Sequence, residues 1–397
     1  MRVRTALVGA IAAAAAVTQA GVAAAAPGGG GHAPARGAVE AAVRDGVPGV
    51  TATAVDRHGT WSATAGTGDL RTGTPRSTAD HYRVGSITKT FISTVLLQLE
   101  AEKRLSLDDT VDTWLPGVVS GNGNDGTRIT VRQLLNHTSG IFNYTADEDF
   151  GATYLAKDGF LRHRYDTVTP EQLVAVALSH KPDFAPGTSW NYSNTNYVLA
   201  GMVIEKVTGR SYASQIRDRI IKPLHLHATS LPGTRVTVPG PHSRAYSKLA
   251  ETTTGPTYDV TSLNPSWGSS AGEMISDSAD LNRFYTALLR GRLLPREQLE
   301  EMKSTVRIDG FPDGGYGLGL LERKLSCGVQ VWGHDGGIHG SISVAVTTTD
   351  GRHSLAFNLN GDWTGDVEAV VEAEFCGTRP PAASPSQGLS PSLSDRL

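Results

Sequence analysis

The 397-residue chain lacks an excess of charge of either sign. It contains 36 Lys and Arg residues against 39 Asp and Glu residues, which gives a formal net charge of −3 at pH 7. A protein that binds nucleic acid or an anionic membrane through its charge needs a basic surface, and this composition does not supply one. We therefore expect no nucleic-acid partner.

Long hydrophobic runs are missing beyond the first 26 residues. A helix that spans a bilayer needs about 20 consecutive apolar residues, and no later segment offers such a stretch. The N-terminus carries Arg2 and Arg4, then an apolar run at 6–17, then small residues. This pattern is typical of a signal peptide. We expect residues 1–26 to be removed on export, so that the protein is secreted without a membrane anchor.

Cysteine is scarce, with only Cys327 and Cys376 in the chain. In an exported protein an even number of cysteines predicts a disulfide. This one would close a loop of about 50 residues and stabilise the fold by roughly 4 kcal/mol on the chain-entropy relation. Metal-ligand spacing is also missing, because the His-Leu-His segment at 225–227 is followed by Thr229 where an aspartate ligand would be needed. We expect neither a metal nor a cofactor.

Composition divides the rest of the chain into three parts. Residues 27–37 are rich in Gly, Ala and Pro and are expected to form a flexible linker. Residues 378–397 are rich in Pro and Ser and are expected to be a disordered tail. The intervening residues 38–377 are more than one core comfortably supports, so we expect one large two-lobed catalytic domain, acting as a monomer.

Hydrophobic periodicity predicts strands near both ends of this domain and helices between them. A strand-like period occurs at 49–56, 60–66, 316–321, 328–332, 341–348 and 354–359. A helical period occurs at 38–45, 86–104, 130–137, 170–180, 193–208, 211–221, 276–291 and 366–375. Strands from distant segments must then share one sheet, so we predict an α+β fold: an antiparallel β-sheet flanked by terminal helices, with a large, mainly helical inserted lobe. The sheet lobe would comprise about 38–85 and 310–377, and the helical lobe about 86–309.

Ser86 and Lys89 place a hydroxyl nucleophile and an amine one helical turn apart. Apolar residues at 91, 92, 95, 96 and 99 follow a helical period, so a helix begins near Ser86. Residues at i and i+3 share a helix face, and the first N–H groups of a helix favour the negative charge of a serine alkoxide. Alone the spacing is weak, because such a pair is more often a helix cap beside a solvated lysine.

Two further motifs follow in order: Tyr-Ser-Asn at 192–194 and His-Asp-Gly-Gly at 334–337. Together with Ser86 and Lys89, they make the chain resemble the penicillin-recognising serine enzymes, which include serine β-lactamases, DD-peptidases and related esterases and D-aminopeptidases. Within this superfamily the motifs look most similar to secreted actinomycete D-alanyl-D-alanine carboxypeptidases. The resemblance covers about 39–376. It implies the same fold, an active site between the lobes, and β-lactams as covalent ligands.

The resemblance implies a role for each motif residue. Ser86 would be the nucleophile that forms an acyl-enzyme. Lys89 and Tyr192 are both candidates for the general base, and we expect Tyr192 to act as a phenolate with the help of Lys89. His334 would polarise Tyr192 and complete the proton network. The backbone N–H groups of Ser86 and Gly337 would form the oxyanion hole.

Several residues are candidates for substrate binding. Asn194 would bind the acyl-side amide carbonyl of the substrate, as the resemblance implies, or it could cap the helix that follows. Phe142, Thr145 and Trp267 match positions that line the pocket in the carboxypeptidases, although packing would explain each of them equally well. The polar run at 137–140 is expected to be a structural turn at the edge of the cleft.

The third motif departs from the carboxypeptidase pattern. Those enzymes present His-Thr-Gly-Thr there and an arginine just before that strand pair, and these groups hold the terminal carboxylate of the substrate. Here Asp335 and Gly337 replace the two threonines, and Leu321 replaces the arginine. Arg323 could reach the same strand face from two residues further on. An ionised Asp335 would repel a bound carboxylate by about 1–4 kcal/mol.

We therefore expect a secreted serine-type D-alanyl-D-alanine carboxypeptidase. It would act through a Ser86 acyl-enzyme on peptidoglycan-type peptides and would be sensitive to penicillin. The alternatives are a D-amino-acid esterase, amidase or D-aminopeptidase, for which Asp335 would face a neutral or cationic group, and a serine β-lactamase. A non-catalytic penicillin-sensing module is disfavoured by the complete set of catalytic residues.

Overall fold

The structure, a computed structural model, describes residues 31–250 and 252–377. The expected signal peptide at 1–26 and tail at 378–397 lie outside these residues. No helix within the described ranges has the length and apolar character that a membrane span requires.

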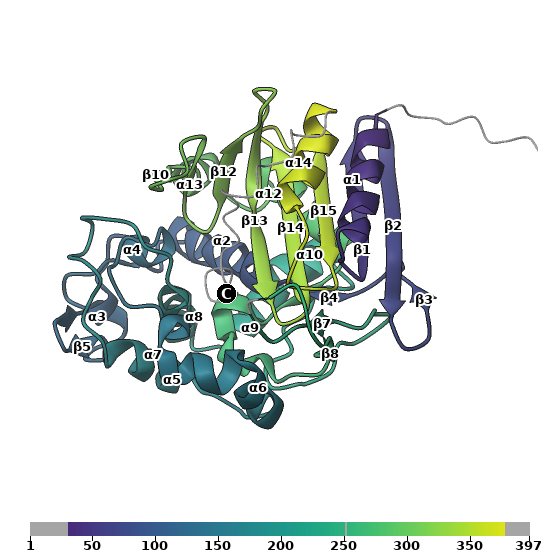
Figure 1. Cartoon of the computed structure of the whole chain (residues 1–397). Helices are drawn as coiled ribbons and strands as arrows, with labels where there is room; N and C mark the ends of the chain where they lie inside the picture. Colours follow the sequence, from purple (N-terminus) through teal and green to yellow (C-terminus); the bar gives the residue numbers. More distant parts are fainter. Residues whose placement is uncertain (1–30, 251, 378–397) are drawn as a thin grey trace, which may run out of the picture. The chain divides into compact units, whose positions relative to one another are not determined.

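A nine-stranded sheet lies at the centre, with the strand order β10-β11-β12-β13-β14-β15-β1-β2-β3 (Figure 1). Its strands are β1 (Gly49–Asp56), β2 (Gly59–Asp69), β3 (Thr74–Pro75), β10 (Val306–Arg307), β11 (Gly314–Tyr316), β12 (Leu321–Lys324), β13 (Gln330–Ile338), β14 (Ser341–Thr348) and β15 (Ser354–Leu359). Each pair is antiparallel, and β1 pairs with β15 through Val50 opposite Leu359. The predicted α+β fold with an antiparallel sheet is confirmed.

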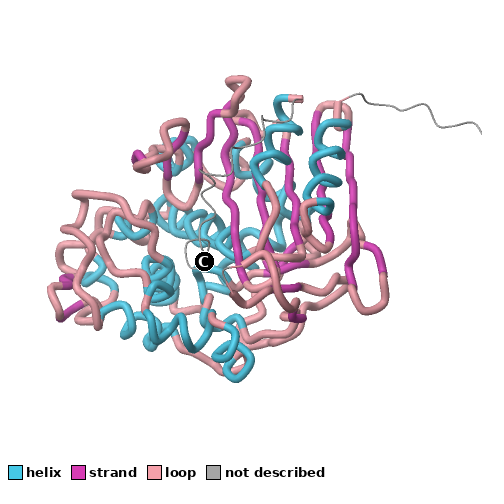
Figure 2. Tube along the Cα trace, viewed as in Figure 1, coloured by secondary structure: helices cyan, strands magenta, loops and turns pink. Residues whose placement is uncertain are grey.

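Helices cover both faces of this sheet (Figures 1 and 2). Helices α1 (Ala33–Arg44) and α14 (Val367–Cys376) contact each other, and they share a core with Val344 and Leu355. Ala345 and Ala356, one position further along each strand, belong to the other core, with α12 (Ser278–Leu289). Because side chains alternate along a strand, α12 packs on the face opposite α1. It therefore packs on the sheet, although its residues fall within the expected helical lobe.

The remaining elements lie between β3 and β10 in the sequence. The helices are α2 (Thr88–Ala101), α3 (Val111–Trp114), α4 (Val131–Leu135), α5 (Glu148–Phe150), α6 (Lys157–His163), α7 (Pro170–Leu178), α8 (Asn194–Thr208), α9 (Tyr212–Ile216), α10 (Lys222–Leu224), α11 (Ser269–Gly272) and α13 (Arg296–Met302). Short 3-10 or π-helical turns occur at η1 (Gly85–Ile87), η2 (Tyr144–Ala146), η3 (Gly151–Leu155), η4 (Arg217–Ile221) and η5 (Pro265–Trp267). Two-residue strands form the pairs β4 (Tyr82–Arg83) with β9 (Ile275–Ser276), β5 (Ser120–Gly121) with β6 (Asn124–Asp125), and β7 (Tyr246–Ser247) with β8 (Tyr258–Asp259).

Helix α1 begins earlier than expected and includes part of the segment at 27–37 that was predicted to be a linker. The linker prediction is wrong from Ala33 onward. Pro34 lies in the first turn of the helix, where its missing N–H costs nothing. Ala35 is fully buried, and so the alanines that suggested flexibility let the helix lie close to its neighbours.

A disulfide joins Cys327, in the turn after β12, to Cys376 at the end of α14, with an S–S distance of 1.98 Å. The two residues are separated by 49 positions in the sequence. The bridge ties the final helix to the strand pair that precedes the third motif.

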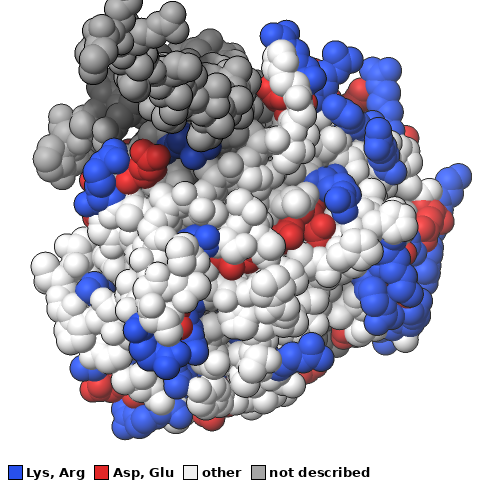
Figure 3. Space-filling view, turned by 90° about the vertical axis from the view of Figure 1, so that its right-hand side faces the viewer, with Lys and Arg blue, Asp and Glu red and all other residues white. Residues whose placement is uncertain are grey.

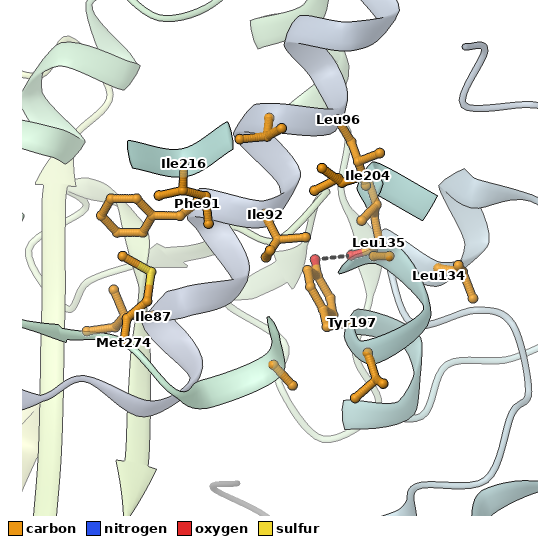
Figure 4. Close-up of a cluster of buried hydrophobic side chains, with 14 of the residues drawn as sticks. Ile87, Phe91, Ile92, Leu96, Leu134, Leu135, Tyr197, Ile204, Ile216 and Met274 are labelled. Atoms are coloured by element: carbon orange, nitrogen blue, oxygen red, sulfur yellow. Dashed lines mark hydrogen bonds between the residues drawn. The ribbon is translucent and has the colours of Figure 1, made fainter. Parts of the chain in front are cut away.

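The core beneath the nucleophile helix joins α2, α4 and α8 (Figure 4). Phe91, Ile92 and Leu96 of α2 are fully buried in it. Tyr197 of α8 donates a hydrogen bond to the carbonyl oxygen of Leu135, 2.8 Å away. Full burial of an apolar side chain contributes about 1.5–3 kcal/mol, so this packing holds in place α2, which carries Lys89, and α8, which carries Asn194.

The prediction of one continuous strand over 316–321 is wrong, because residues 317–320 form a turn. Strand β11 ends at Tyr316 and β12 begins at Leu321, and these two residues pair with each other across a tight turn. Gly319 in this turn has a φ of 71°, and a Cβ there would lie 2.3 Å from the hydroxyl oxygen of Ser93. The chain must therefore reverse where the apolar alternation suggested that it continues.

Strand β13 is longer than its periodicity predicted. The alternation ends at Trp332, but the strand continues to Ile338 and pairs with β14 over most of its length. Glycines at 336–337 break the alternation because this part of the strand faces the nucleophile turn and not a hydrophobic core. Strand β12 pairs with β13 only as far as Gly333, so β12 does not cover the strand edge that follows.

Charged side chains of both signs occur on the face shown in Figure 3. Uncharged residues cover most of this face, while basic side chains gather at its upper right, along its right-hand side and at its lower left, with acidic ones among them. The distribution agrees with the near-balance of charge in the sequence.

Candidate active site

Ser86 lies in the 3-10 turn η1, immediately before α2, in direct contact with β13. Gly85 has a φ of 53°, and a Cβ on it would lie 2.6 Å from the carbonyl oxygen of Gly337. A Cβ on Gly336 would lie 2.6 Å from the backbone nitrogen of Ser86. Only glycine permits so close a backbone approach. Ser86 and Gly337, the predicted oxyanion-hole pair, are therefore on two backbone segments that touch.

Lys89 is fully buried and its amine nitrogen has three close partners. It lies 2.8 Å from the Ser86 hydroxyl, 2.7 Å from the side-chain oxygen of Asn194 and 2.8 Å from the carbonyl oxygen of Ala271. Burial lowers the pKa of Lys89 well below 10.5, although the charge of Asp335 acts in the opposite direction. A neutral amine has two N–H groups for Asn194 and Ala271 and a lone pair for the Ser86 proton.

Tyr192 is on the loop before α8, with its ring centre 4.8 Å from the Lys89 nitrogen. Its hydroxyl is buried and makes no hydrogen bond of good geometry within the described residues. Burial raises the pKa of Tyr192 well above 10; proximity to the Ser86 hydroxyl favours the phenolate, but less strongly. The phenol therefore keeps its proton near neutral pH. This favours Lys89 as the base, contrary to our expectation for Tyr192.

His334 hydrogen-bonds Tyr316 and not Tyr192. Its Nε2 accepts from the Tyr316 hydroxyl at 2.9 Å, while Nδ1 donates to the carbonyl oxygen of Asp335. Burial lowers the pKa of His334 to about 4, so the ring is neutral at pH 7. We expected His334 to polarise Tyr192, but the hydrogen bond of its Nε2 is to Tyr316. Tyr316 was missed by the sequence reasoning, because only the turn after β11 brings it to the site.

Asn194 is the first residue of α8, and its side chain points to Lys89 and not back along the helix. Its amide nitrogen donates to the hydroxyl of Thr145 at 3.3 Å, and its backbone N–H donates to the side chain of Asn143 at 3.1 Å. Ser193 makes no side-chain capping bond at this helix start. Thr145 is buried, so it supports Asn194 from behind. The motif gave no signal for Asn143.

The two aromatic residues that were predicted to line the pocket differ in exposure. Phe142 is half-buried and stacks on His180 with ring centres 3.9 Å apart. Trp267 is 2% exposed, and its carbonyl oxygen accepts a hydrogen bond from Tyr144 at 2.6 Å. Phe142 therefore retains surface for a substrate, whereas Trp267 is mainly a core residue.

Arg323, the candidate carboxylate clamp, is held by two acidic residues. Its guanidinium lies 3.1 Å from Asp335 and 2.6 Å from Glu368, and the residue is 7% exposed. Burial works against the charged guanidinium, but the two carboxylates together raise the pKa of Arg323. The positive charge is therefore already compensated before any substrate binds.

Metal ligands are not grouped in the part of the chain that the structure describes. No set of three or more His, Cys, Asp and Glu residues there could hold a metal ion.

Comparison with known proteins identifies the family. The Beta-lactamase family matches residues 14–372, and the chain belongs to it. The protein is thus a serine hydrolase of the β-lactamase and penicillin-binding-protein superfamily, as the motifs predicted.

Three relatives indicate which members of the superfamily the chain is similar to. A D-stereospecific amidohydrolase from Streptomyces sp. is 62% identical with a TM-score of 0.84, covering 87% of this chain and 99% of its own. A D-amino acid amidase from Ochrobactrum anthropi SV3 is 29% identical with a TM-score of 0.71, covering 83% and 90%. Penicillin-binding protein 4* of Bacillus subtilis (strain 168) is 27% identical over 311 residues, which are 75% of this chain but only 64% of that relative. These similarities support the predicted alternative, an amidase, better than the carboxypeptidase.

Proposed function

We propose that this protein is a D-stereospecific amidohydrolase that cleaves amides of D-amino-acid-derived substrates through an acyl-enzyme on Ser86. The state of Arg323 carries the proposal. In a carboxypeptidase an arginine must be available to the substrate carboxylate, whereas this one is bound by Asp335 and Glu368. A neutral leaving group needs no such clamp. The 62% identity to a D-stereospecific amidohydrolase supports the same conclusion.

Proton transfer in this proposal begins at Lys89. Its neutral amine removes the proton from Ser86, whose oxygen attacks the substrate carbonyl. The backbone N–H groups of Ser86 and Gly337 stabilise the negative charge that develops on the carbonyl oxygen, an effect of roughly 10²–10³ in rate for each donor. Tyr192, which keeps its proton, donates to the departing amine and is reprotonated from Lys89. Water then hydrolyses the acyl-enzyme by the reverse route.

Substrate binding is proposed at the edge of β13. Beyond Gly333 this strand is not covered by β12, so an extended substrate can add its backbone there as a further strand. Asn194, whose side chain is held in place by Lys89 and Thr145, would bind the acyl side of the substrate. Phe142 is half-buried, and the part of its ring that remains accessible offers an aromatic surface for a substrate side chain.

The decisive experiment compares matched substrates with the purified protein. An acyl-D-alanyl-D-alanine peptide and its C-terminal amide would be tested together with the amides of D- and L-phenylalanine. We expect the amides to be cleaved faster than the free acid, and D faster than L. Ser86→Ala should abolish cleavage, whereas Ser93→Ala, which removes a buried hydroxyl of the following helix α2, should retain it. Clear preference for the free acid would restore the carboxypeptidase assignment.

Two further predictions accompany this proposal. Export through residues 1–26 remains a prediction, to be checked by sequencing the N-terminus of the mature protein. Acylation of Ser86 by a β-lactam is expected from the shared mechanism, and it would be detected as a mass increase that Ser86→Ala removes.

A further inference from the structure

His137 is a fully buried histidine that is bonded on both sides of Tyr192. Its carbonyl oxygen accepts the backbone N–H of Asn191 at 3.1 Å. Its ring nitrogen Nδ1 accepts the backbone N–H of Ser193 and the side-chain amide of Asn196, both at 3.2 Å. The residues immediately before and after Tyr192 are therefore both hydrogen-bonded to His137, one to its backbone and one to its ring.

These contacts determine the tautomer of the ring. Because Nδ1 accepts from two N–H groups, its lone pair must be available and the proton must be on Nε2. Burial, with smaller effects from Lys89 and His334, lowers the pKa of His137 well below 6.5. Nε2 is buried without a hydrogen-bond partner in the described part of the chain. A second proton would remove the acceptor that holds Ser193, so the neutral ring is the one that fits.

The ring of His137 also packs against the ring of Tyr192. The two ring centres are 4.3 Å apart, and the ring of Tyr316 is 4.7 Å from His137 on another side. Tyr316 in turn bonds His334. The ring of Tyr192 is in contact with both the Lys89 amine and the ring of His137. Its position relative to Lys89 therefore depends on His137.

We propose that His137 is a positioning residue that holds the Tyr192 hydroxyl in place for proton transfer, through its acceptor bond to Ser193 and its ring contact. It touches no reacting atom and acts only through Tyr192. The inference rests on the acyl-enzyme chemistry proposed above but not on the choice of substrate. Displacement of a catalytic group by about 1 Å can cost roughly 10²-fold in rate, and we expect a loss of this order when the anchor is removed.

The backbone at His137 suggests two informative substitutions. Its φ of 62° is in the left-handed region, which asparagine and glycine tolerate well. His137→Asn keeps an acceptor oxygen close to the position of Nδ1. His137→Gly keeps the turn but removes both the acceptor for Ser193 and the ring that packs against Tyr192. His353→Asn is a matched control, because it removes another histidine ring, which bonds Glu374 near the far end of the sheet.

The test uses the burst of p-nitrophenolate from p-nitrophenyl acetate, which reports acylation of Ser86 whatever amide the enzyme prefers. Ser86→Ala defines the background, and melting temperatures are recorded for every variant. We expect His137→Gly to acylate roughly 10²-fold more slowly with KM changed less than about two-fold. His137→Asn should recover at least about ten-fold of that loss, and His353→Asn should match the parent.

Specific results would overturn the proposal. One is an acylation rate in His137→Gly that equals the parent. Another is equal loss in the Asn and Gly variants, since that would exclude the acceptor bond. A third is a rate loss in His353→Asn as large as that in His137→Gly at the same melting temperature. Failure of the amide preference with a normal burst would remove the proposed substrate but leave the role of His137 intact, whereas a parent without a Ser86-dependent burst would refute both.

Discussion

Asp335→Asn is the substitution that most directly tests why the enzyme would reject a substrate with a terminal carboxylate. Asparagine keeps the size and shape of the side chain but removes its negative charge. In the parent protein this charge lies beside Arg323, 3.1 Å away, on the strand that carries the third motif. A carboxylate on the leaving group of the substrate would approach the same strand.

The size of the effect follows from Coulomb's law. Two like charges about 8 Å apart repel by roughly 2 kcal/mol at an effective dielectric constant of about 20. The side chain of Asp335 is 43% exposed, so solvent screening reduces the repulsion to about 1 kcal/mol. This corresponds to roughly five-fold in kcat/KM. Asp335→Asn should therefore raise the ratio of kcat/KM for the free acid over the amide by about five-fold.

The assay measures this ratio with the acyl-D-alanyl-D-alanine pair. Asp335 also raises the pKa of Lys89, but that change affects both substrates equally and cancels in the ratio. Glu368→Gln is the control, because it removes the other carboxylate on Arg323 from α14 and not from β13. We expect it to change the ratio less than two-fold. An unchanged ratio in Asp335→Asn would refute the electrostatic explanation, and equal increases in both variants would assign the effect to release of Arg323.

Two other expectations concern pH and stability. Activity should rise from acidic pH as Lys89 loses its proton. It should then stay level to about pH 9, because burial holds the pKa of Tyr192 well above 10. A fall in activity between about pH 8 and 9 that Tyr192→Phe removes would show instead that the phenol titrates in this range. Replacing both Cys327 and Cys376 by alanine should lower the free energy of unfolding by about 4 kcal/mol, since the bridge closes a 49-residue separation. Urea unfolding measures this, and a loss below about 1 kcal/mol would contradict the chain-entropy reasoning.

The residues of the three motifs could be predicted from the sequence because each motif is short. The i, i+3 spacing of Ser86 and Lys89 already implies a shared helix face, and the structure has their reactive atoms 2.8 Å apart. Asn194 was predicted to bind substrate or to cap a helix. The structure adds a contact of its side chain with Lys89, which depends on how α2 packs against α8.

The supporting residues could not be predicted in this way. Tyr316 reaches His334 only because the chain reverses at Gly319, where the apolar alternation suggested a continuous strand. His137 was expected to be part of a structural turn, and its bond to Ser193 joins segments that are far apart in the sequence. Periodicity shows which face of an element is buried, but it contains no information on which other element covers that face.

The pairing of β1 with β15 has a consequence for the order in which the protein folds. The β1–β2 hairpin has no inner neighbour until the strands from the other end of the chain arrive, and an isolated hairpin is marginally stable in water. Closing so long a loop costs conformational entropy and slows folding. The sheet is thus completed late, and its completion also delivers the Gly-Gly strand to the nucleophile turn. A chain that stops before β13 would therefore lack Gly337, the second of the two proposed oxyanion-hole donors, as well as the centre of its sheet, so we expect catalysis to begin only when the sheet is complete.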